Sequence, residues 1–232
     1  GTRVAKVLRQ FGDAAPESWA CWAFSNHDVE RHASRWGLSP EAVRLYAALL
    51  MSLRGTICLY QGEELGLTEA HVPFEDLQDP YGKRFWPKFK GRDGCRTPMA
   101  WSHDQVHGGF SQGKPWLPVA MEHVQAAVEV QDGDEASTLN FYRRMIDFRR
   151  AYAALLKGDF ELVGADDTYI SFIRAHGNAR VFCAFNLSDE DRVVTMPEGS
   201  WQVDRGAPFT CVEDDTNATL PPWQALFAFA GA

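Results

Sequence analysis

Three clusters of polar residues in this chain could do chemistry. The first, Asn26–Asp28 (Asn-His-Asp), is separated from the apolar run Ser18–Phe24 only by Ser25. The second, Gln61–Glu64 (Gln-Gly-Glu-Glu), follows the apolar run Thr56–Tyr60, and the third is Arg92–Arg96 (Arg-Asp-Gly-Cys-Arg). Carboxylates and imidazoles can act as acids, bases or electrostatic stabilisers, and a guanidinium presents paired donors to carboxylates and hydroxyl groups. These residue types therefore fit acid–base chemistry on a hydroxyl-bearing substrate.

Each cluster also has a structural interpretation, and the residues alone leave both open. Asp28 precedes Val29–His32 and can be the N-cap of a helix that begins there. Glu63 and Glu64 can cap the following helix or accept hydrogen bonds from loop amides. The arginines and the aspartate of Arg92–Arg96 can form an ion pair that pins a long loop.

The elements around the first two clusters indicate a βα repeat of a parallel sheet. The runs Ser18–Phe24 and Thr56–Tyr60 have the length and apolar character of buried strands. Between them, Ser39-Pro40-Glu41 has an N-cap residue, a proline at the first helical position and an acid in the first turn. This helix is predicted to run to about Arg54 and to stop at Gly55. Polar residues at the ends of parallel strands line the active sites of such folds.

The rest of the chain changes character twice. Gly66 to Glu135 has little periodicity and many aromatic residues, which favours a functional loop region over disorder. Thr138–Leu156 has the apolar spacing of an amphipathic helix. The remainder predicts short antiparallel strands, at Tyr169–Arg174, Ala179–Asn186, Arg192–Met196 and Ala225–Phe229. We therefore expect two domains, residues 1–158 and residues 159–232.

Composition excludes several classes of protein. The 232 residues are 45% hydrophobic and 23% charged, which is an ordinary globular profile. The net charge of -8 argues against a nucleic-acid partner, because phosphate attracts clustered Lys and Arg. No run of about 18 apolar residues predicts a membrane span. The five cysteines are odd in number and contain no CxxC pair, so we expect neither a disulfide framework nor a zinc site but a reducing, cytoplasmic location.

Four motifs resemble conserved segments of the α-amylase superfamily of retaining glycoside hydrolases. They lie in the family's order: Phe24–Val29 (FSNHDV), Leu59–Gly66 (LYQGEELG), Phe74–Tyr81 (FEDLQDPY) and Arg92–Trp101 (RDGCRTPMAW). The first is similar to the superfamily's fourth conserved region. The others are similar to the eighth barrel strand, a bacterial subgroup segment and the arginine loop of the α-glucosidase and oligo-1,6-glucosidase branch.

The resemblance implies an α/β fold built on a (β/α)8 TIM barrel. It places this chain at the C-terminal portion of that barrel, with strands 7 and 8 and their helices, followed by an all-β antiparallel sandwich domain. Asp28 takes the position of the family's third catalytic carboxylate, which grips sugar hydroxyls and favours the oxocarbenium-like transition state. His27 and Asn26 are expected to bind the same sugar. Arg96 is expected to close the pocket around the terminal glucose, and Arg92 to lie nearer the leaving group.

The chain also departs from the family. No segment resembles the nucleophile or the acid/base region, and the retaining mechanism needs both carboxyl groups about 5 Å apart. The chain alone is therefore expected to be inactive and to need the remaining N-terminal part of the enzyme or a partner chain. The expected substrate is an α-glucoside oligosaccharide such as maltose, with no cofactor and no metal. The alternative is a non-catalytic carbohydrate-binding module or a chain that completes a barrel with a partner.

Overall fold

The computed structural model describes residues 1–204, 209, 211–213 and 217–230 of the chain. Contacts divide it into two compact units. The β-rich unit contains Gly1–Trp22, Arg44–Ile57 and Arg144–Ala232, and the loop-rich unit contains Ala23–Val43 and Cys58–Arg143. The three polar clusters named above all belong to the loop-rich unit.

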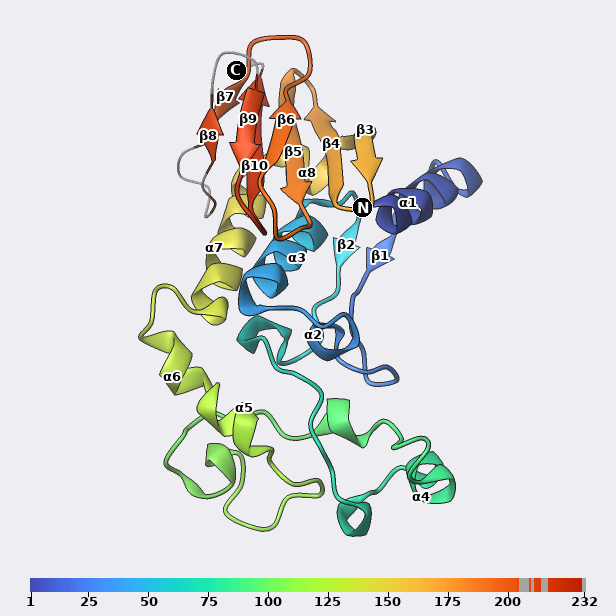
Figure 1. Ribbon diagram of the computed structural model, residues 1–232, viewed down its shortest axis with the longest axis vertical. Helices are drawn as coiled ribbons and strands as arrows, with labels where there is room; N and C mark the ends of the chain where they lie inside the picture. The colour runs from blue at the N-terminus through green and yellow to red at the C-terminus, as the bar shows by residue number, and fades with distance from the viewer. Residues whose placement is uncertain (205–208, 210, 214–216, 231–232) are drawn as a thin grey trace. The chain divides into compact units, whose positions relative to one another are not determined.

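The β-rich unit contains two antiparallel sheets (Figure 1). The larger has the strand order β3 (Asp159–Asp166), β4 (Tyr169–His176), β5 (Ala179–Asn186), β10 (Ala225–Ala230) and β7 (Gln202–Val203). The smaller has the order β6 (Arg192–Thr195), β9 (Asn217–Leu220) and β8 (Val212–Glu213). The predicted strand Ala179–Asn186 is confirmed to the residue, and those at 169, 192 and 225 to within two residues of their ends.

The central strands of the larger sheet are apolar on both faces. The residues paired in register across β4 and β5 alternate, Phe172 with Cys183 on one face and Ile173 with Phe182 on the other. The second face shares one apolar cluster with β6 and β9 of the smaller sheet. On the first face, Phe227 of β10 packs edge-on against Phe148. Burial on both sides explains why these strands read as nearly continuous apolar runs.

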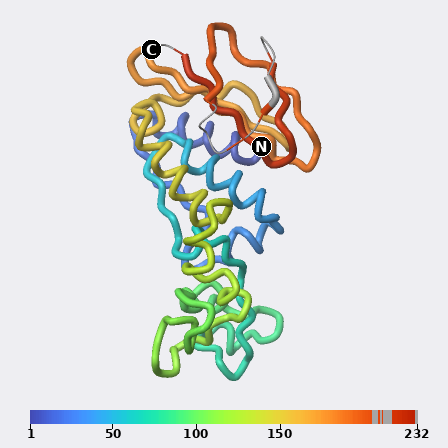
Figure 2. Tube along the Cα trace, turned by 90° about the vertical axis from the view of Figure 1, so that its left-hand side faces the viewer, coloured from blue at the N-terminus to red at the C-terminus, as the bar shows by residue number. Residues whose placement is uncertain are grey.

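Helices α3 (Pro40–Ser52) and α7 (Thr138–Ala151) lie side by side where they enter the β-rich unit, in both views of the trace (Figures 1 and 2). Arg149 of α7 donates to the carbonyl oxygens of Met51, Leu53 and Gly55, which satisfies acceptors at the C-terminal end of α3. Helix α1 (Thr2–Ala14) contacts β3 and β4, and α8 (Ala153–Lys157) contacts β4 and β5.

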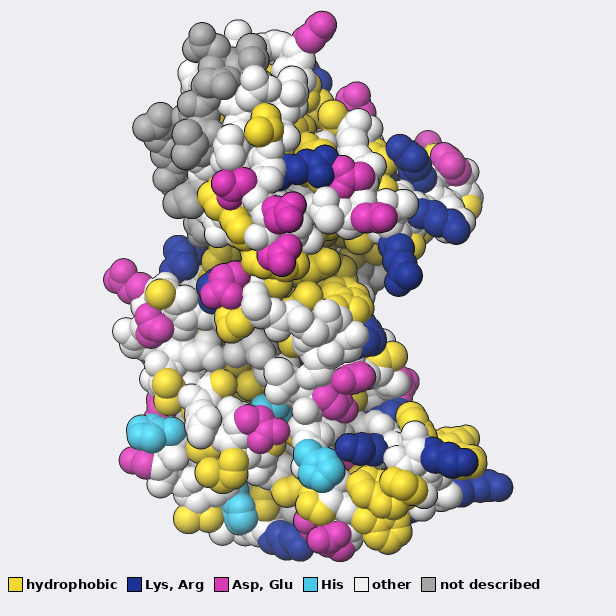
Figure 3. Space-filling view, in the orientation of Figure 1, with side chains coloured by type: hydrophobic (Ala, Val, Ile, Leu, Met, Phe, Trp, Pro, Cys, Tyr) yellow, Lys and Arg dark blue, Asp and Glu magenta, His cyan; other side chains and the backbone are white. Residues whose placement is uncertain are grey.

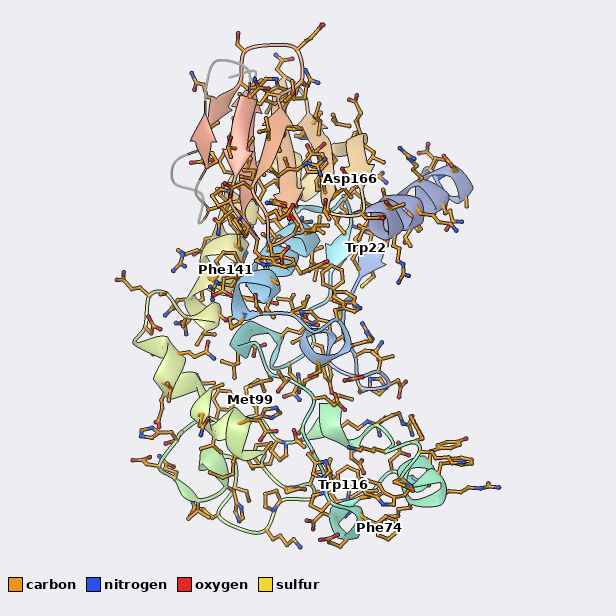
Figure 4. The ribbon with its side chains drawn as sticks, viewed as in Figure 1. Trp22, Phe74, Met99, Trp116, Phe141 and Asp166 are labelled. Carbon is orange, nitrogen blue, oxygen red and sulfur yellow. The ribbon has the colours of Figure 1, made fainter. Side chains whose placement is uncertain are left out.

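One parallel pair is present, and it is shorter than predicted. Strand β1 spans only Cys21–Trp22 and β2 only Thr56–Ile57, paired in parallel register. The predicted extents, Ser18–Phe24 and Thr56–Tyr60, are therefore wrong. Within the described residues this sheet has two strands, so each of them has a hydrogen-bonded neighbour on one side only. The Trp22 indole, labelled in Figure 4, instead donates to the carbonyl oxygen of Arg54 at 2.8 Å.

The loop-rich unit consists of short helical turns joined by loops. Its α-helices are α2 (His32–Arg35), α4 (Pro80–Phe85), α5 (Met121–Gln125) and α6 (Val128–Asp132). Its 3-10 turns are Glu63–Leu65, Phe74–Asp76, Asp93–Arg96 and Val106–Gly109. Small apolar clusters, such as Val72, Leu77 and Leu117, support these turns locally.

The single helix predicted over Thr138–Leu156 is divided into two helices, α7 and α8. α7 ends at Ala151 and α8 begins at Ala153, because Tyr152 between them has the extended dihedral angles φ -116° and ψ 112°. The Tyr152 hydroxyl donates to the Asp204 carboxylate at 2.9 Å. Among the helices that the structure describes, none has both the length and the apolar character needed to cross a membrane.

Candidate active site

The Asp28 carboxylate is the meeting point of two arginines. Arg92 donates from Nη1 to Oδ1 of Asp28 at 2.9 Å, and Arg96 donates from Nη2 to the same oxygen at 3.0 Å. The other carboxylate oxygen, Oδ2, lies 3.4 Å from Nε2 of His27. The Asp28 side chain is 52% exposed. One oxygen is thus fixed by two cations, while the side chain remains open to solvent.

Local hydrogen bonds shape the loop that carries Asp28. The side-chain oxygen of Asn26 accepts the backbone N–H of Asp28 at 2.8 Å, which closes a tight turn. The Ser25 hydroxyl accepts the backbone N–H of His32 and lies 3.0 Å from Nδ1 of its ring. Helix α2 begins at His32 with Arg31 at its N-cap position, so the interpretation of Asp28 as a helix N-cap is wrong.

The arginine loop is fixed by a second carboxylate, Asp79. Arg92 donates to it from Nε at 2.8 Å, from Nη2 at 3.3 Å and from its backbone N–H at 2.9 Å. Arg96 is fixed differently, since its Nε donates to the carbonyl oxygen of His27 at 2.7 Å. Asp93 does not pair with either arginine; its buried carboxylate accepts the backbone N–H groups of Gln78 and Asp79.

Two glycines let the arginine loop approach the Asp79 segment. Gly91 has a φ of +80°, a conformation that L side chains rarely adopt. A Cβ at Gly91 would lie 2.9 Å from the Cα of Gly82 and 3.1 Å from the Cβ of Asp79. A Cβ at Gly82 would lie 2.6 Å from the carbonyl oxygen of Lys90. The two chain segments therefore touch through backbone, which places Arg92 next to Asp79.

The arginines hold both carboxylates in their charged form. The hydrogen bond from Arg92 lowers the pKa of Asp28, and the charges of His27, Arg92 and Arg96 act in the same direction. The hydrogen bonds from Arg92 also lower the pKa of Asp79, to about 2. In turn, the two carboxylates raise the pKa of Arg92. Asp28, Asp79 and Arg92 are therefore charged at neutral pH.

The Gln61–Glu64 cluster makes structural contacts. Glu64 accepts the backbone N–H of Gly62 at 2.8 Å, as the loop-amide alternative expects. Glu63 is buried, with Oε1 3.6 Å from Nδ1 of His32. Burial raises the pKa of Glu64. Neither side chain contacts Asp28 through a hydrogen bond or ion pair recorded among the described residues.

Two residues of the candidate site, Arg31 and Asp79, were not singled out by the sequence analysis. Arg31 is buried and donates to the carbonyl oxygens of Gln61 and Cys95, so it ties together segments far apart in sequence. Asp79 had a visible signal, because it precedes Pro80 as an N-cap precedes a proline at the first helical position. That signal predicts only the helix, not the contact with Arg92.

A cavity of about 430 Å³ opens beside Asp28, a volume in the range of small-molecule sites. It is lined by Asp28, Glu30, Ser34, Glu69, Ala70, His71, Phe89, Lys90, Gly91 and Arg92. Carboxylates, a lysine, an arginine and an aromatic ring together suit a polyhydroxylated ligand. Asn26, His27 and Arg96 adjoin Asp28 but do not line this cavity.

One group of residues has the composition of a metal site. Ligand atoms of His103, Asp104 and Glu129 lie within 4.8 Å of one another on the exposed surface. Glu129 already accepts hydrogen bonds from the Ser102 hydroxyl and the backbone N–H of His103, both at 2.6 Å. The hydrogen bonds and ion pairs of Asp28 among the described residues involve none of these three side chains, and the expectation of no metal stays a prediction.

Comparison with known proteins finds one matching family model and relatives that are described as glucosidases. The family model described as "Alpha amylase, catalytic domain" matches residues 3–158. A probable alpha-glucosidase of Rhizobium meliloti (strain 1021) is 54% identical over 230 residues, which are 97% of this chain and 42% of that protein. Probable oligo-1,6-glucosidase 2 of Bacillus subtilis (strain 168) is 33% identical over 207 residues, 78% of this chain and 36% of that protein.

Solved structures of two related enzymes are also similar to this chain. The crystal structure of the alpha-glucosyl transfer enzyme XgtA superposes with a TM-score of 0.92 at 43% identity, covering 98% of this chain and 43% of that one. Isomaltulose synthase from Klebsiella sp. LX3, at 24% identity and a TM-score of 0.84, has the same fold over 97% of this chain. The chain spans less than half the length of each of these proteins.

Proposed function

The chain belongs to the α-amylase family, and from this premise we propose that it is the C-terminal part of an α-glucosidase. The complete enzyme hydrolyses, or transfers, α-linked glucose from the non-reducing end of short oligosaccharides such as maltose. It does so with retention of configuration. In this proposal residues 1–158 are the last two βα units of a (β/α)8 barrel, and residues 159–232 are an antiparallel β-sandwich domain.

The hydrogen bonding of Asp28 is the observation that carries this proposal. Arg92 and Arg96 both bind Oδ1, so the carboxylate is held charged and oriented before substrate arrives. The side chain lies at a cavity of about 430 Å³ and is half exposed. A preorganised negative charge of this kind stabilises the positive charge that develops on a glucosyl ring in an oxocarbenium-like transition state.

The neighbouring residues have distinct roles in the proposal. Asp28 accepts hydrogen bonds from sugar hydroxyls and stabilises the transition state. His27, Asn26 and Arg96 bind the same terminal glucose, and Arg92 lies toward the leaving group. Asn26 also shapes the loop, since its side chain closes the turn at Asp28.

Two carboxyl groups of the retaining mechanism must come from outside this sequence. Nucleophile and acid/base are supplied by the remaining N-terminal part of the enzyme or by a partner chain, and the reaction needs no organic cofactor. The proposed location is the cytoplasm. The cysteines support it, because Cys21, Cys58, Cys95 and Cys183 form no disulfide bond.

The test is an assay of the full-length enzyme with 4-nitrophenyl α-D-glucopyranoside and with maltose. We expect release of glucose whose first-formed anomer, followed by proton NMR, is the α-anomer. The isolated 232-residue chain, assayed at the same concentration, is expected to show no turnover above background. A first-formed β-anomer, or no turnover by the full-length enzyme, would contradict the proposal.

A further inference from the structure

We infer that Asp79 is a positioning residue for the proposed reaction: it fixes the guanidinium of Arg92 so that the remaining donor of Arg92 holds Asp28. This inference rests on the proposed function of Asp28. It assigns a role to a buried carboxylate that does not line the cavity beside Asp28.

The Asp79 carboxylate accepts hydrogen bonds from three donors of Arg92. Nε and Nη2 of Arg92 bind the two carboxylate oxygens of Asp79, and the backbone N–H of Arg92 binds one of them as well. The Asp79 side chain has no exposed surface, whereas the Arg92 side chain is 32% exposed. A two-pronged contact of this kind fixes the plane of the guanidinium as well as its position.

The same guanidinium reaches Asp28 with its one terminal nitrogen that does not contact Asp79. Nη1 of Arg92 donates to Oδ1 of Asp28 at 2.9 Å. Because the guanidinium is rigid and planar, orienting two of its nitrogens also orients the third. Asp28 therefore has two supports, Arg96 anchored on the His27 carbonyl oxygen and Arg92 anchored on Asp79.

Asp79 is itself held in place. Its backbone N–H donates at 2.8 Å to Asp93, whose buried carboxylate also binds the N–H of Gln78 at 2.6 Å. Its Oδ1 accepts the N–H of Tyr81 at 3.1 Å as the N-cap of α4. Since Arg92 adjoins Asp93 in sequence, the loop and the Asp79 segment are clamped together from both sides. This rigidity lets a residue outside the cavity position one inside it.

Asp79→Asn is the informative change. The amide is nearly isosteric and still accepts at one atom, but it carries no charge and presents an N–H₂ group to a guanidinium that can only donate. Arg92 then loses its fixed orientation and Asp28 loses one of two supports. We expect kcat to fall by about 10-fold or more while KM for 4-nitrophenyl α-D-glucopyranoside changes less than about 3-fold.

The pH profile separates positioning from a merely structural role. In the native site the Arg92 hydrogen bond lowers the pKa of Asp28. Loosening that bond raises the pKa, so any part of the acid limb that reports Asp28 moves to higher pH in the Asp79→Asn enzyme. Loss of the α4 N-cap alone would lower Tm and leave the pH profile unchanged.

The experiment is a double-mutant cycle in the full-length enzyme with Asp79→Asn, Arg92→Met and the double variant, each assayed below its measured Tm. If Asp79 acts through Arg92, the double variant has the kcat of Arg92→Met within about 2-fold. Asp76→Asn is the matched control, because Asp76 lies three residues away and pairs only loosely with Lys114 at 3.8 Å. It should retain wild-type kcat and pH profile.

Several outcomes overturn the inference. They are an Asp79→Asn enzyme with wild-type kcat and pH profile, multiplicative losses in the double variant, or an Arg92→Met enzyme with wild-type kcat. Should Asp79→Asn fail to fold, the comparison of the double variant with Arg92→Met still decides, because both lack the guanidinium through which Asp79 acts. A kcat of the double variant well below that of Arg92→Met then contradicts the inference. Failure of the proposed function looks different: the wild-type enzyme shows no turnover, or Asp28→Asn keeps its kcat, and the inference falls with it.

Discussion

The guanidinium of Arg31 donates from Nη2 to the carbonyl oxygen of Cys95 at 3.1 Å, across 64 residues of sequence. Its Nη1 donates to the carbonyl oxygen of Gln61 at 2.8 Å. Arg31 is almost completely buried, and burial lowers its pKa. A single cation thus joins the segment that follows Asp28, the segment that follows β2 and the arginine loop.

The first prediction concerns this buried cation. Arg31→Met fills similar space but removes the Arg31 donor from the Gln61 carbonyl oxygen and one of two donors from the Cys95 carbonyl oxygen, where the Tyr60 hydroxyl remains. The loss of each charge-assisted hydrogen bond costs about 1.5–3 kcal/mol. We expect differential scanning calorimetry to show a lowered Tm of the full-length enzyme. We also expect a reduced kcat, because Arg31 no longer holds the segments at Gln61 and Cys95 in place. Arg84→Met, at an exposed arginine that contacts Phe85, is the control and should leave Tm unchanged within about 1 °C. Equal Tm values for the two variants would contradict the role of Arg31.

The second prediction concerns Asp28. Asp28→Asn in the full-length enzyme keeps the shape of the side chain but removes the charge that, in the proposed function, stabilises the transition state. We expect kcat to fall about 10²–10³-fold, with a much smaller change in KM. Steady-state kinetics with 4-nitrophenyl α-D-glucopyranoside provides the measurement, and Asp13→Asn on the exposed side of α1 is the charge-matched control. A kcat within a few-fold of wild type would show that Asp28 is not the stabilising carboxylate.

The third prediction concerns Arg96. Arg96→Ala removes one of the two arginine donors to Asp28, the donor to the His27 carbonyl oxygen and, in the proposed function, a contact to the terminal glucose. We expect a clear rise in KM for maltose, on the order of 10-fold, because a charge-assisted contact contributes about 1.5–3 kcal/mol. Isothermal titration of a glucose-like inhibitor should show the same loss in Kd. An unchanged KM and Kd would place the glucose pocket elsewhere.

The β-rich unit shows what sequence patterns can predict. Ala179–Asn186 is an apolar run between turn residues, and the strand has those bounds. Strand β3 was missed although Asp159–Asp166 alternates strictly between exposed and half-buried positions. Acids at both ends and a register shift near Gly164 weaken its resemblance to a strand. The hydrophobic pattern therefore predicts the buried strand β5. It does not predict β3, an edge strand of the larger sheet that carries charged residues and a bulge.

The candidate site shows why sequence motifs alone do not predict the contacts between its residues. The clusters around Asp28 and Arg92 could be found in sequence, but their hydrogen bond joins residues 64 positions apart. No local period reports such a contact. The loop-amide interpretation of Glu64 was confirmed, because that contact is local and spans two residues. Long-range ion pairs such as Asp79 with Arg92 depend on how loops close, which hydrophobic periodicity does not encode.

The last prediction concerns Gly91, where the arginine loop touches the Asp79 segment. Gly91→Ala places a Cβ at a φ of +80° and within 2.9 Å of the Cα of Gly82, so the backbone of one segment must move. We expect a lower Tm and, because Arg92 follows directly, a kcat reduced about 10-fold or more.

Gly113→Ala is the matched control for this change. A Cβ at Gly113 meets nothing within 4 Å, and its φ lies outside the left-handed region. That variant should keep the wild-type kcat and a Tm at or slightly above that of wild type, because replacing a glycine whose conformation alanine can adopt tends to stabilise the fold. Thermal unfolding and steady-state kinetics on the two full-length variants decide the matter. If Gly91→Ala behaves like Gly113→Ala, the close approach of the two segments does not position Arg92.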